Sequence, residues 1–327
     1  MPPVRPTTTA WRWLKRQLWL NVPVRECIRW GLRWHGTWER LARRWTLSGA
    51  VPVRVNGVSL RLHSRLDDWN VQYLYYGLPW ETAERTFWAS ISRSAACVLD
   101  VGANAGLFSF LAAAHQPAAQ VHAFEPSPRI YPRLERNRAL NRFANVTLHE
   151  VAVGNSQETV TLHLPDTAAN TGIASVNGAF TAAHGTKTVP HRVPQITLDA
   201  FAATLQRPID LIKIDVEGYE YAVLQGAQQV LNTHKPVVLL ELFDPEVLAA
   251  QRPELALQLG QDYFEASIHL LQTAGYCAYA LQPTGLLRVD APTEVLAIAS
   301  NWVWSTRRTT ARWVPYSQAA SLLPVRT

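Results

Sequence analysis

The stretch Val98–Gly106, VLDVGANAG, decides the fold, because it joins a buried strand to a helix through a tight turn. The strand ends on Asp100, and the helical sequence GLFSFLAAAH follows the turn. Gly102 permits a tight turn, and Asn104 is the non-glycine residue that best tolerates a left-handed backbone. Gly106 would let the helix begin close to a ligand. The stretch therefore predicts a strand–turn–helix unit with a binding site at the turn.

A second buried strand, QVHAFE, follows this helix and ends on Glu125. In nucleotide-binding folds an acid about 20 residues beyond the glycine loop accepts hydrogen bonds from ribose hydroxyls. Asp100 and Glu125 together predict a site for a nucleoside cofactor. The glycine loop alone does not say which cofactor, because NAD enzymes, FAD enzymes and methyltransferases share it.

Strand-like and helix-like patterns alternate from Cys97 onward. The strand-like runs include CVLDV, QVHAFE, DLIKID and PVVLLELF, each separated from the next by helical sequence. Such alternation is typical of a parallel sheet covered by helices. We therefore predict an α/β fold, a doubly wound and mostly parallel sheet with helices on both faces. Residues 49–96 should form a hairpin that turns at Asn56-Gly57 and a helical lead-in, and residues 306–327 a loosely structured tail.

Residues 1–48 form a basic leader rich in Trp and Arg. Residues 1–45 carry a net charge of +8, whereas the rest of the chain carries −2. An apolar stripe recurs at helical spacing with arginines opposite it: Cys27, Trp30, Trp34, Trp38, Leu41 and Trp45. This pattern predicts an amphipathic helix that packs on the body or a second subunit, or lies on an anionic membrane surface. Nucleic acid is the least favoured partner.

The three cysteines are Cys27, Cys97 and Cys277, and they lie far apart in the chain. This spacing argues against a disulfide framework or a zinc site and suits a reducing compartment. Basic residues interrupt the N-terminus where a signal peptide needs an apolar run, and no run approaches the ~20 residues of a membrane span. We expect a cytoplasmic protein, membrane-associated on the cytoplasmic face if the leader binds lipid. A homo-oligomer is left open.

The combination of DVGAN with KIDVEG is more specific than either motif alone. The segments VLDVGANAGLFSF, AFEPSP, NVTLHEVAVGN, ITLDAF, DLIKIDVEGYEYAVLQGA and LLELF occur in this order between Val98 and Phe243. This region resembles the FkbM-type S-adenosylmethionine-dependent methyltransferases. The resemblance implies a seven-stranded Rossmann-like methyltransferase domain over residues 97–305, with S-adenosylmethionine as cofactor. It also implies O-methylation of a hydroxyl on a sugar, glycolipid or secondary metabolite.

The resemblance also assigns the cofactor-binding residues. The methionine end of the cofactor would lie over Asp100, Gly102, Ala103, Asn104 and Gly106. Glu125 would take both ribose hydroxyls, Pro126 and Ser127 would shape the turn, and the adenine would rest near Glu150, Val151 and Ala152. The acceptor, a small molecule or glycan, should bind in a pocket drawn from residues 64–90 and 165–195.

Acids that follow two neighbouring strands supply the candidate catalytic groups. An alcohol is a poor nucleophile until a base accepts its proton, so the reaction needs a carboxylate beside the methyl group. Asp215 is the favoured base, with Glu217 second and Glu241 able to join them from the adjacent strand. Lys213 should point to the same side as Asp215 and hold a carboxylate ionised.

Other interpretations of these acids and of the whole chain stay open. Glu217 could simply cap the following helix. Asp215 and Glu241 could hold a divalent cation that acidifies the hydroxyl, although this needs Glu241 and Asp244 to replace two ligands and is less favoured than a metal-free site. An NAD-dependent oxidoreductase fits the glycine loop and Glu125 alone. An inactive membrane or protein-interaction module would make the leader the working part.

Overall fold

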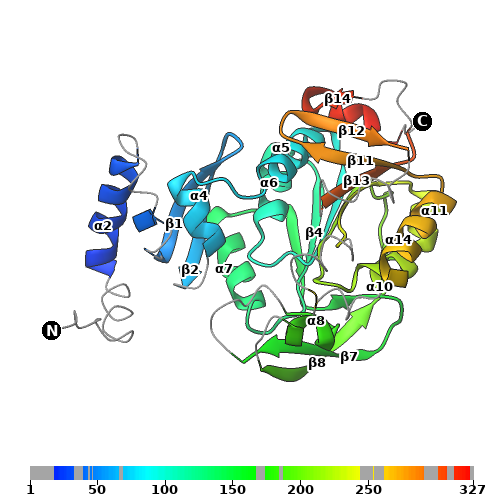
Figure 1. Ribbon diagram of the computed structural model, residues 1–327, viewed down its shortest axis with the longest axis horizontal. Helices are drawn as coiled ribbons and strands as arrows, with labels where there is room; N and C mark the ends of the chain where they lie inside the picture. Colours follow the sequence, from blue (N-terminus) through cyan, green and yellow to red (C-terminus); the bar gives the residue numbers. More distant parts are fainter. Residues whose placement is uncertain are drawn as a thin grey trace.

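The computed structural model describes residues 18–32, 40–42, 45, 47–65, 69–166, 174–183, 187–243, 253, 261–290, 301–307 and 313–324 (Figure 1). Its centre is a nine-stranded sheet of order β14-β12-β11-β13-β10-β9-β3-β4-β5. The strands are β3 (Cys97–Val101), β4 (Gln120–Phe124), β5 (Val146–His149), β9 (Leu211–Ile214), β10 (Val237–Glu241), β11 (Cys277–Gln282), β12 (Gly285–Val289), β13 (Asn301–Ser305) and β14 (Trp313–Pro315).

The strand directions confirm the predicted doubly wound, mostly parallel sheet. The strands from β5 to β10 pair in parallel, and the chain winds outward from β3 in both directions. Strand β13 is antiparallel to both β10 and β11, so β11 again runs with the parallel set. These seven strands match the predicted number. Strands β12 and β14 extend the sheet beyond it by antiparallel pairing.

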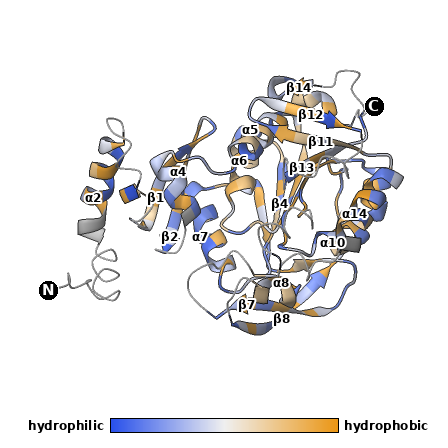
Figure 2. Ribbon diagram, viewed as in Figure 1, coloured by the Kyte–Doolittle hydropathy of each residue, from blue (hydrophilic) through white to orange (hydrophobic). Residues whose placement is uncertain are grey.

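Helices cover both faces of the sheet, as the sequence predicts. Successive strand residues alternate between two apolar clusters: Val98 faces one, whereas Cys97 and Leu99 face the other. On the first face lie α5 (Thr82–Ile91), α6 (Leu107–His115), α7 (Tyr131–Asn141) and the short 3-10 helix η4 (Tyr316–Leu322). On the second lie α9 (Leu198–Ala202), α10 (Glu220–Gln225), α11 (Gln228–Thr233) and α14 (Gln261–Thr273). Figure 2 shows the apolar colouring of the strands between them.

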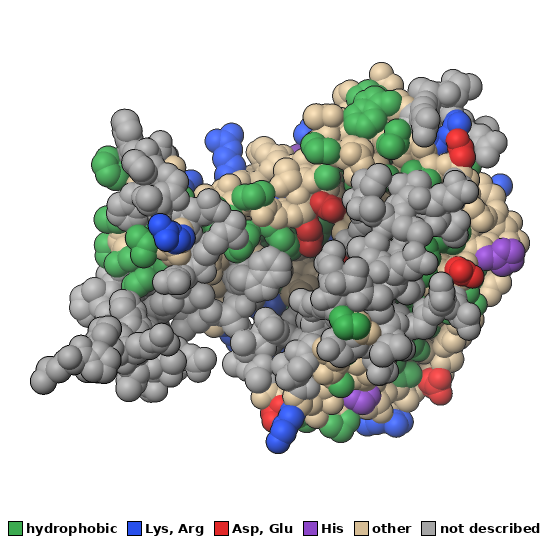
Figure 3. All heavy atoms as spheres, viewed as in Figure 1, with side chains coloured by type: hydrophobic (Ala, Val, Ile, Leu, Met, Phe, Trp, Pro, Cys, Tyr) green, Lys and Arg blue, Asp and Glu red, His purple; other side chains and the backbone are tan. Residues whose placement is uncertain are grey.

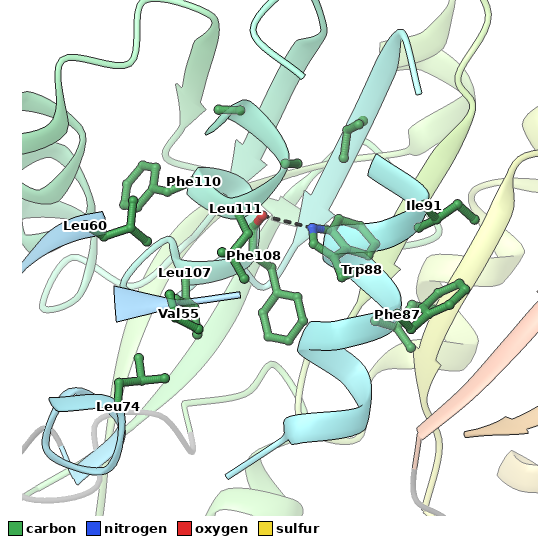
Figure 4. Close-up of a cluster of buried hydrophobic side chains, with 14 of the residues drawn as sticks. Val55, Leu60, Leu74, Phe87, Trp88, Ile91, Leu107, Phe108, Phe110 and Leu111 are labelled. Carbon is green, nitrogen blue, oxygen red and sulfur yellow. Dashed lines mark hydrogen bonds between the residues drawn. The ribbon is translucent and has the colours of Figure 1, made fainter. Parts of the chain in front are cut away.

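Large side chains from α5 and α6 form the centre of the first cluster (Figure 4). Trp88 is fully buried, its indole Nε1 donates to the Phe108 carbonyl over 2.9 Å, and its ring meets that of Phe108 edge-on. A buried indole without such an acceptor would leave a polar group unsatisfied. This contact joins the lead-in segment to the helix that follows the glycine loop.

The lead-in also contains the predicted hairpin, β1 (Ser48–Val55) and β2 (Val58–Arg65), which pairs Val55 with Val58 across Asn56-Gly57. Helix α4 (Trp69–Tyr76) and the 3-10 turn η1 (Ser92–Ser94) complete it. After β5 the chain forms a separate three-stranded sheet of order β6-β8-β7, which contains β6 (Ala152–Val153), β7 (Thr159–Pro165) and β8 (Thr188–Ile196). Helix α8 (Gly178–Ala183) packs on it, at the bottom of Figure 1.

The leader contributes helix α2 (Leu18–Gly31), at the left of Figure 1. Ile28 is buried, and Val24 and Leu32 pack against the core beside it. The stripe predicted from the sequence lies largely on another side: Trp30 is 62% exposed and Leu41 is 50% exposed. Trp45 does pack against the core. Trp34 and Trp38 lie outside the described residues.

The C-terminal residues are more ordered than the sequence predicts. Instead of a loose tail from residue 306, Trp313–Pro315 form β14, and Tyr316, Ala319 and Leu322 are buried in the first cluster. Ring contact between Tyr316 and Phe87, 6.2 Å apart, joins η4 to α5. The prediction failed here because a short strand paired to a distant partner leaves no local pattern.

Two general expectations can be compared with the described part of the chain. No helix there is long and apolar enough to cross a membrane. Cys27, Cys97 and Cys277 are all free thiols.

Candidate active site

The carboxyl ends of β3, β4 and β9 meet, and backbone hydrogen bonds join the loops that follow them. The amides of Gly102 and Ala103 both donate to the Phe124 carbonyl, over 3.0 and 2.9 Å, and the Asp215 amide donates to the Val101 carbonyl over 3.0 Å. Gly102 and Asn104 have positive φ angles of 82° and 49°, as the sequence predicts for this turn. The glycine loop is therefore held rigidly against the strand that carries the predicted catalytic acid.

These loops open onto a cavity of about 330 Å³. A volume of this order is typical of small-molecule sites in proteins. The predicted site residues in its lining are Asp100, Gly102, Ala103, Asn104, Glu125, Pro126, Val151, Ala152, Lys213, Asp215, Glu217 and Glu241. Acidic side chains also lie near the middle of the face seen in Figure 3.

Asp100 leaves one carboxylate oxygen available to a ligand. The residue is only 1% exposed, and its Oδ2 accepts a hydrogen bond from Ser109 Oγ over 2.5 Å. Its Oδ1 is buried, with no hydrogen-bond partner among the described residues. Burial raises the pKa of Asp100, and Lys213 opposes that rise. A buried carboxylate oxygen without a donor fits an ammonium group of a ligand, because a charged donor offsets the cost of desolvation.

Glu125 is held with its carboxylate at the end of β4. Its Oε2 accepts from the Asn104 amide and its Oε1 from the Ser127 amide, both over 2.9 Å. Burial raises the pKa of Glu125 to about 7, and the hydrogen bonds from the two backbone amides limit the rise. A carboxylate has about four acceptor positions. Two therefore remain for hydroxyl donors, which is what a ribose diol requires.

Three of the predicted cofactor residues do not line the cavity. Gly106 is needed for packing, since a β-carbon there would lie 2.5 Å from the Phe110 ring and 2.6 Å from Leu134. Its expected approach to a ligand is thus not seen. Ser127 is buried and acts on the turn through its amide, and Glu150 is exposed on the surface. Val151 and Ala152 are the members of the proposed adenine set that reach the cavity.

Lys213 and Asp215 form an ion pair in the lining of the same cavity, on β9 and in the loop that follows it. The Lys213 Nζ is 2.6 Å from Asp215 Oδ2 and 4.7 Å from the centre of the Phe108 ring. Burial alone would lower the pKa of Lys213, but Asp215, Asp100 and Glu81 together raise it above its usual range. Lys213 is therefore cationic, and the sequence-based expectation that it faces Asp215 is met.

The pKa values of the acidic side chains around this pair are shifted in opposite directions. Burial favours a raised pKa for Asp215, but Lys213 and a hydrogen bond from Glu241 bring it below its usual value. Burial and the Asp215 charge raise the pKa values of Glu217 and Glu241 well above theirs. Asp215 is therefore the most acidic of the three carboxyl groups, and Glu217 and Glu241 bind a proton more tightly than usual.

The loop after β9 is fixed by Glu220, which is fully buried at the start of α10. Its Oε1 accepts from the amides of Val216 and Gly218 over 3.0 and 3.2 Å, and Tyr263 on α14 donates to its other oxygen. Glu220 thus fixes this loop, and α10 has no side-chain cap from Glu217 or from its N-cap residue, Tyr219. Glu217, with a left-handed φ of 56°, lines the cavity instead.

Residues outside the sequence motifs complete the lining. They come from 62–81, including Asn70, Leu74, Trp80 and Glu81, and from 174–176. These belong largely to the two segments from which the acceptor pocket was expected to draw. The sequence analysis included the segment of Glu81 but did not single out the residue, because no motif surrounds it. The only local signal was an acidic residue directly before a helix.

Metal ligation gains no geometric support within the described ranges. No group of three or more His, Cys, Asp or Glu side chains there is arranged to hold a metal ion. Asp244, which the metal hypothesis needed as a ligand, lies outside those ranges.

Comparison with known proteins identifies the family. Residues 100–276 match the model of the Methyltransferase FkbM domain, which is more than half of the chain. The chain therefore belongs to the FkbM methyltransferase family. This agrees with S-adenosylmethionine, the cofactor predicted from the sequence, and supports methyl transfer over the hydride transfer of an oxidoreductase.

Individual relatives are more distant. The chain is 31% identical over 229 residues to the AMB antimetabolite synthetase AmbE of Pseudomonas aeruginosa, covering 58% of this chain but only 10% of AmbE. It is 29% identical over 189 residues to Methyltransferase sdnD of Sordaria araneosa, covering 50% of this chain and 73% of sdnD. A solved FkbM methyltransferase from Methylobacillus flagellatus is 16% identical with a TM-score of 0.35, covering 73% of this chain and 55% of that one.

Proposed function

We propose that this protein is an S-adenosylmethionine-dependent O-methyltransferase that acts on a hydroxyl of a sugar, glycolipid or secondary metabolite. The observation that carries the proposal is that one cavity is lined both by the glycine loop with Glu125 and by the ion pair of Lys213 with Asp215. The first set suits a nucleoside cofactor, and the second suits an acceptor that must lose a proton.

S-adenosylmethionine would supply an electrophilic methyl group on a positively charged sulfur. In the proposed complex Glu125 accepts hydrogen bonds from the ribose hydroxyls, and the unpaired oxygen of Asp100 receives the ammonium of the amino-acid end. Val151 and Ala152 border the adenine. The acidic lining favours the cationic donor over its neutral product, which helps the product to leave.

The residues of this chain must then align an acceptor hydroxyl and take its proton. Asp215 and Glu217 are the carboxylates that the sequence favours for this task, and both line the cavity. The buried Lys213 ammonium fixes the direction of Asp215. Glu241, whose raised pKa favours its protonated form, is hydrogen-bonded to Asp215 and helps to hold it.

The proposal is tested by binding and by product analysis. Calorimetric titration should show binding of S-adenosylhomocysteine and none of NADH. Methyl-labelled S-adenosylmethionine, incubated with a panel of monosaccharides, phenols and their amine analogues, should label a hydroxyl oxygen. Binding of NADH alone, or label found on nitrogen, would contradict the proposal. Cofactor binding with no transfer to any acceptor would favour the inactive-module alternative.

A further inference from the structure

Glu81 reaches the cavity from outside the part of the chain that defines the family. It directly precedes α5, whereas the family match begins at residue 100. Its side chain lines the same cavity as Asp215 and Lys213. It forms no side-chain hydrogen bond with the described residues. A carboxylate in this position is available to a bound acceptor.

The backbone at Glu81 is held in a costly conformation. Its φ and ψ angles are 41° and 44°, in the left-handed region that favours glycine. Six non-glycine residues have positive φ within the described part of the chain, and three of these, Glu81, Asn104 and Glu217, line this one cavity. Such strain persists where the surrounding structure enforces it, and it is concentrated at functional sites.

Arg85 holds the backbone at Glu81, and the 3-10 helix η4 holds α5 further along. The Arg85 guanidinium donates through two nitrogens to the Trp80 carbonyl, over 2.9 and 2.7 Å, and the Arg85 amide donates to the Glu81 carbonyl over 3.0 Å. Ser90, further along α5, donates to the Tyr316 carbonyl. Arg85 therefore fixes the turn at Glu81, and η4 holds the far end of the helix that follows it.

Asp215 is poorly placed to receive another proton. Its carboxylate is already bound by the Lys213 ammonium and by Glu241, and these two groups together hold its pKa below the usual value. Burial and the charge of Asp215 raise the pKa of Glu217 well above its usual value. Asp215 therefore offers no open position, whereas the Glu81 carboxylate does.

The charged groups that face Glu81 come from three directions. Burial is the main reason that its pKa is raised to about 8, with Lys213 opposing the rise and Asp215 adding to it. The other groups that interact with it are Glu84 and Arg85 on α5, together with Glu217 and Glu241. A cation entering the cavity lowers this pKa, so a positively charged methyl donor favours the ionised form.

From this geometry we propose that Glu81, rather than Asp215, is the base that takes the proton of the acceptor hydroxyl. This assignment rests on the proposed methyl transfer. As the hydroxyl oxygen forms its bond to the methyl carbon, the carbon–sulfur bond breaks and its electron pair stays on sulfur. The hydroxyl proton passes to the Glu81 carboxylate, which later releases it to solvent. Asp215 and Lys213 then act as a fixed polar wall that orients the acceptor.

A first experiment requires no acceptor. S-adenosylmethionine and S-adenosylhomocysteine differ only in the methyl group and the charge on sulfur. Calorimetry near pH 8 in two buffers of different ionisation enthalpy measures the protons that each ligand releases on binding. The wild-type protein should release more with S-adenosylmethionine, and Glu81→Gln should lose at least half of that difference. The matched control Glu84→Gln, in the first turn of the helix that Glu81 precedes but outside the cavity lining, should keep it.

A second experiment measures turnover with the hydroxyl acceptors named above. Glu81→Gln should lower kcat by about 100-fold or more, a typical loss for a general base, while the Kd for S-adenosylhomocysteine changes by less than about threefold. Glu81→Asp should recover part of the rate. The wild-type pH profile of kcat/KM should rise with pH through a midpoint at or below about pH 8, and Glu81→Gln should lose that rise.

The outcomes separate this inference from the proposed function. An unchanged proton difference or an unchanged kcat in Glu81→Gln would overturn the role of Glu81 and leave O-methylation intact. Absence of hydroxyl methylation by the wild-type protein would overturn both. If thermal unfolding shows that Glu81→Gln is misfolded, the comparison of Glu81→Asp with the wild-type pH profile decides, because an unshifted profile contradicts the proposal.

Discussion

A β-carbon on Gly102 would lie 1.8 Å from the carbonyl oxygen of Asp215. The cofactor loop and the loop that carries the candidate catalytic acid are thus in direct backbone contact. No side chain can be inserted there without moving one loop relative to the other.

Gly102→Ala should therefore impair binding of S-adenosylhomocysteine by about tenfold or more and lower the melting temperature. Gly57→Ala is the matched control, because Gly57 has nearly the same φ, 81° against 82°, but nothing lies within 4 Å of an added β-carbon. Calorimetric titration and thermal unfolding of both variants separate the contact from the backbone strain. Equal effects in the two variants would show that the contact is unimportant.

Asp215→Asn should lower turnover by at least ~100-fold with little change in cofactor affinity, because it leaves the Lys213 ammonium without its closest counter-charge. Steady-state kinetics and calorimetry measure the two effects. Asp290→Asn is the control, since it removes an ion pair with Arg288 whose aspartate is 66% exposed. Exposed pairs contribute little. Unchanged turnover in Asp215→Asn would exclude Asp215 from the reaction.

The buried Glu125 makes the ligand-free protein less stable as the pH rises. Its pKa is about 7 in the fold against an ordinary value of 4.5, so between these values the folded form holds a proton that the unfolded chain has lost. Unfolding then releases a proton, and the free energy of unfolding falls with rising pH until about pH 7. As the pH rises from 5 to 7.5, the melting temperature of Glu125→Gln should increase relative to that of the wild-type protein. A constant difference in melting temperature between the two proteins over this pH range would show that Glu125 is not the cause of the pH dependence.

Most of the residues that the sequence assigns to the cofactor line the cavity, because buried parallel strands are apolar throughout and their acids follow directly at the sheet edge. It could not predict Glu81, which reaches the cavity only through the packing of α5 against α6 and η4. The prediction that Glu150 borders the adenine was not matched by its position in the structure, for a local reason. The strand ends at His149, and the next residue turns outward before Ala152 enters another sheet.

The hypothesis that the leader binds an anionic membrane surface makes a direct prediction about its exposed side chains. Trp30 and Leu41 are 62% and 50% exposed on a segment that carries most of the excess positive charge. Trp30→Ala combined with Leu41→Ser should reduce co-sedimentation with phosphatidylglycerol vesicles and leave the low binding to phosphatidylcholine vesicles unchanged. Trp313→Ala is the control, because this tryptophan is 41% exposed on β14. Equal vesicle binding by all three proteins would exclude lipid contact through these residues.

The contact of η4 with α5 has a consequence for how such enzymes diversify. The cavity is lined by residues between Leu62 and Glu241, and η4 lies behind it, in contact with α5. Exchanges in the lead-in segment before α5 can reshape the cavity beside the acceptor without altering the loop that follows β3. Selection could in this way retune one specificity while keeping the other constant.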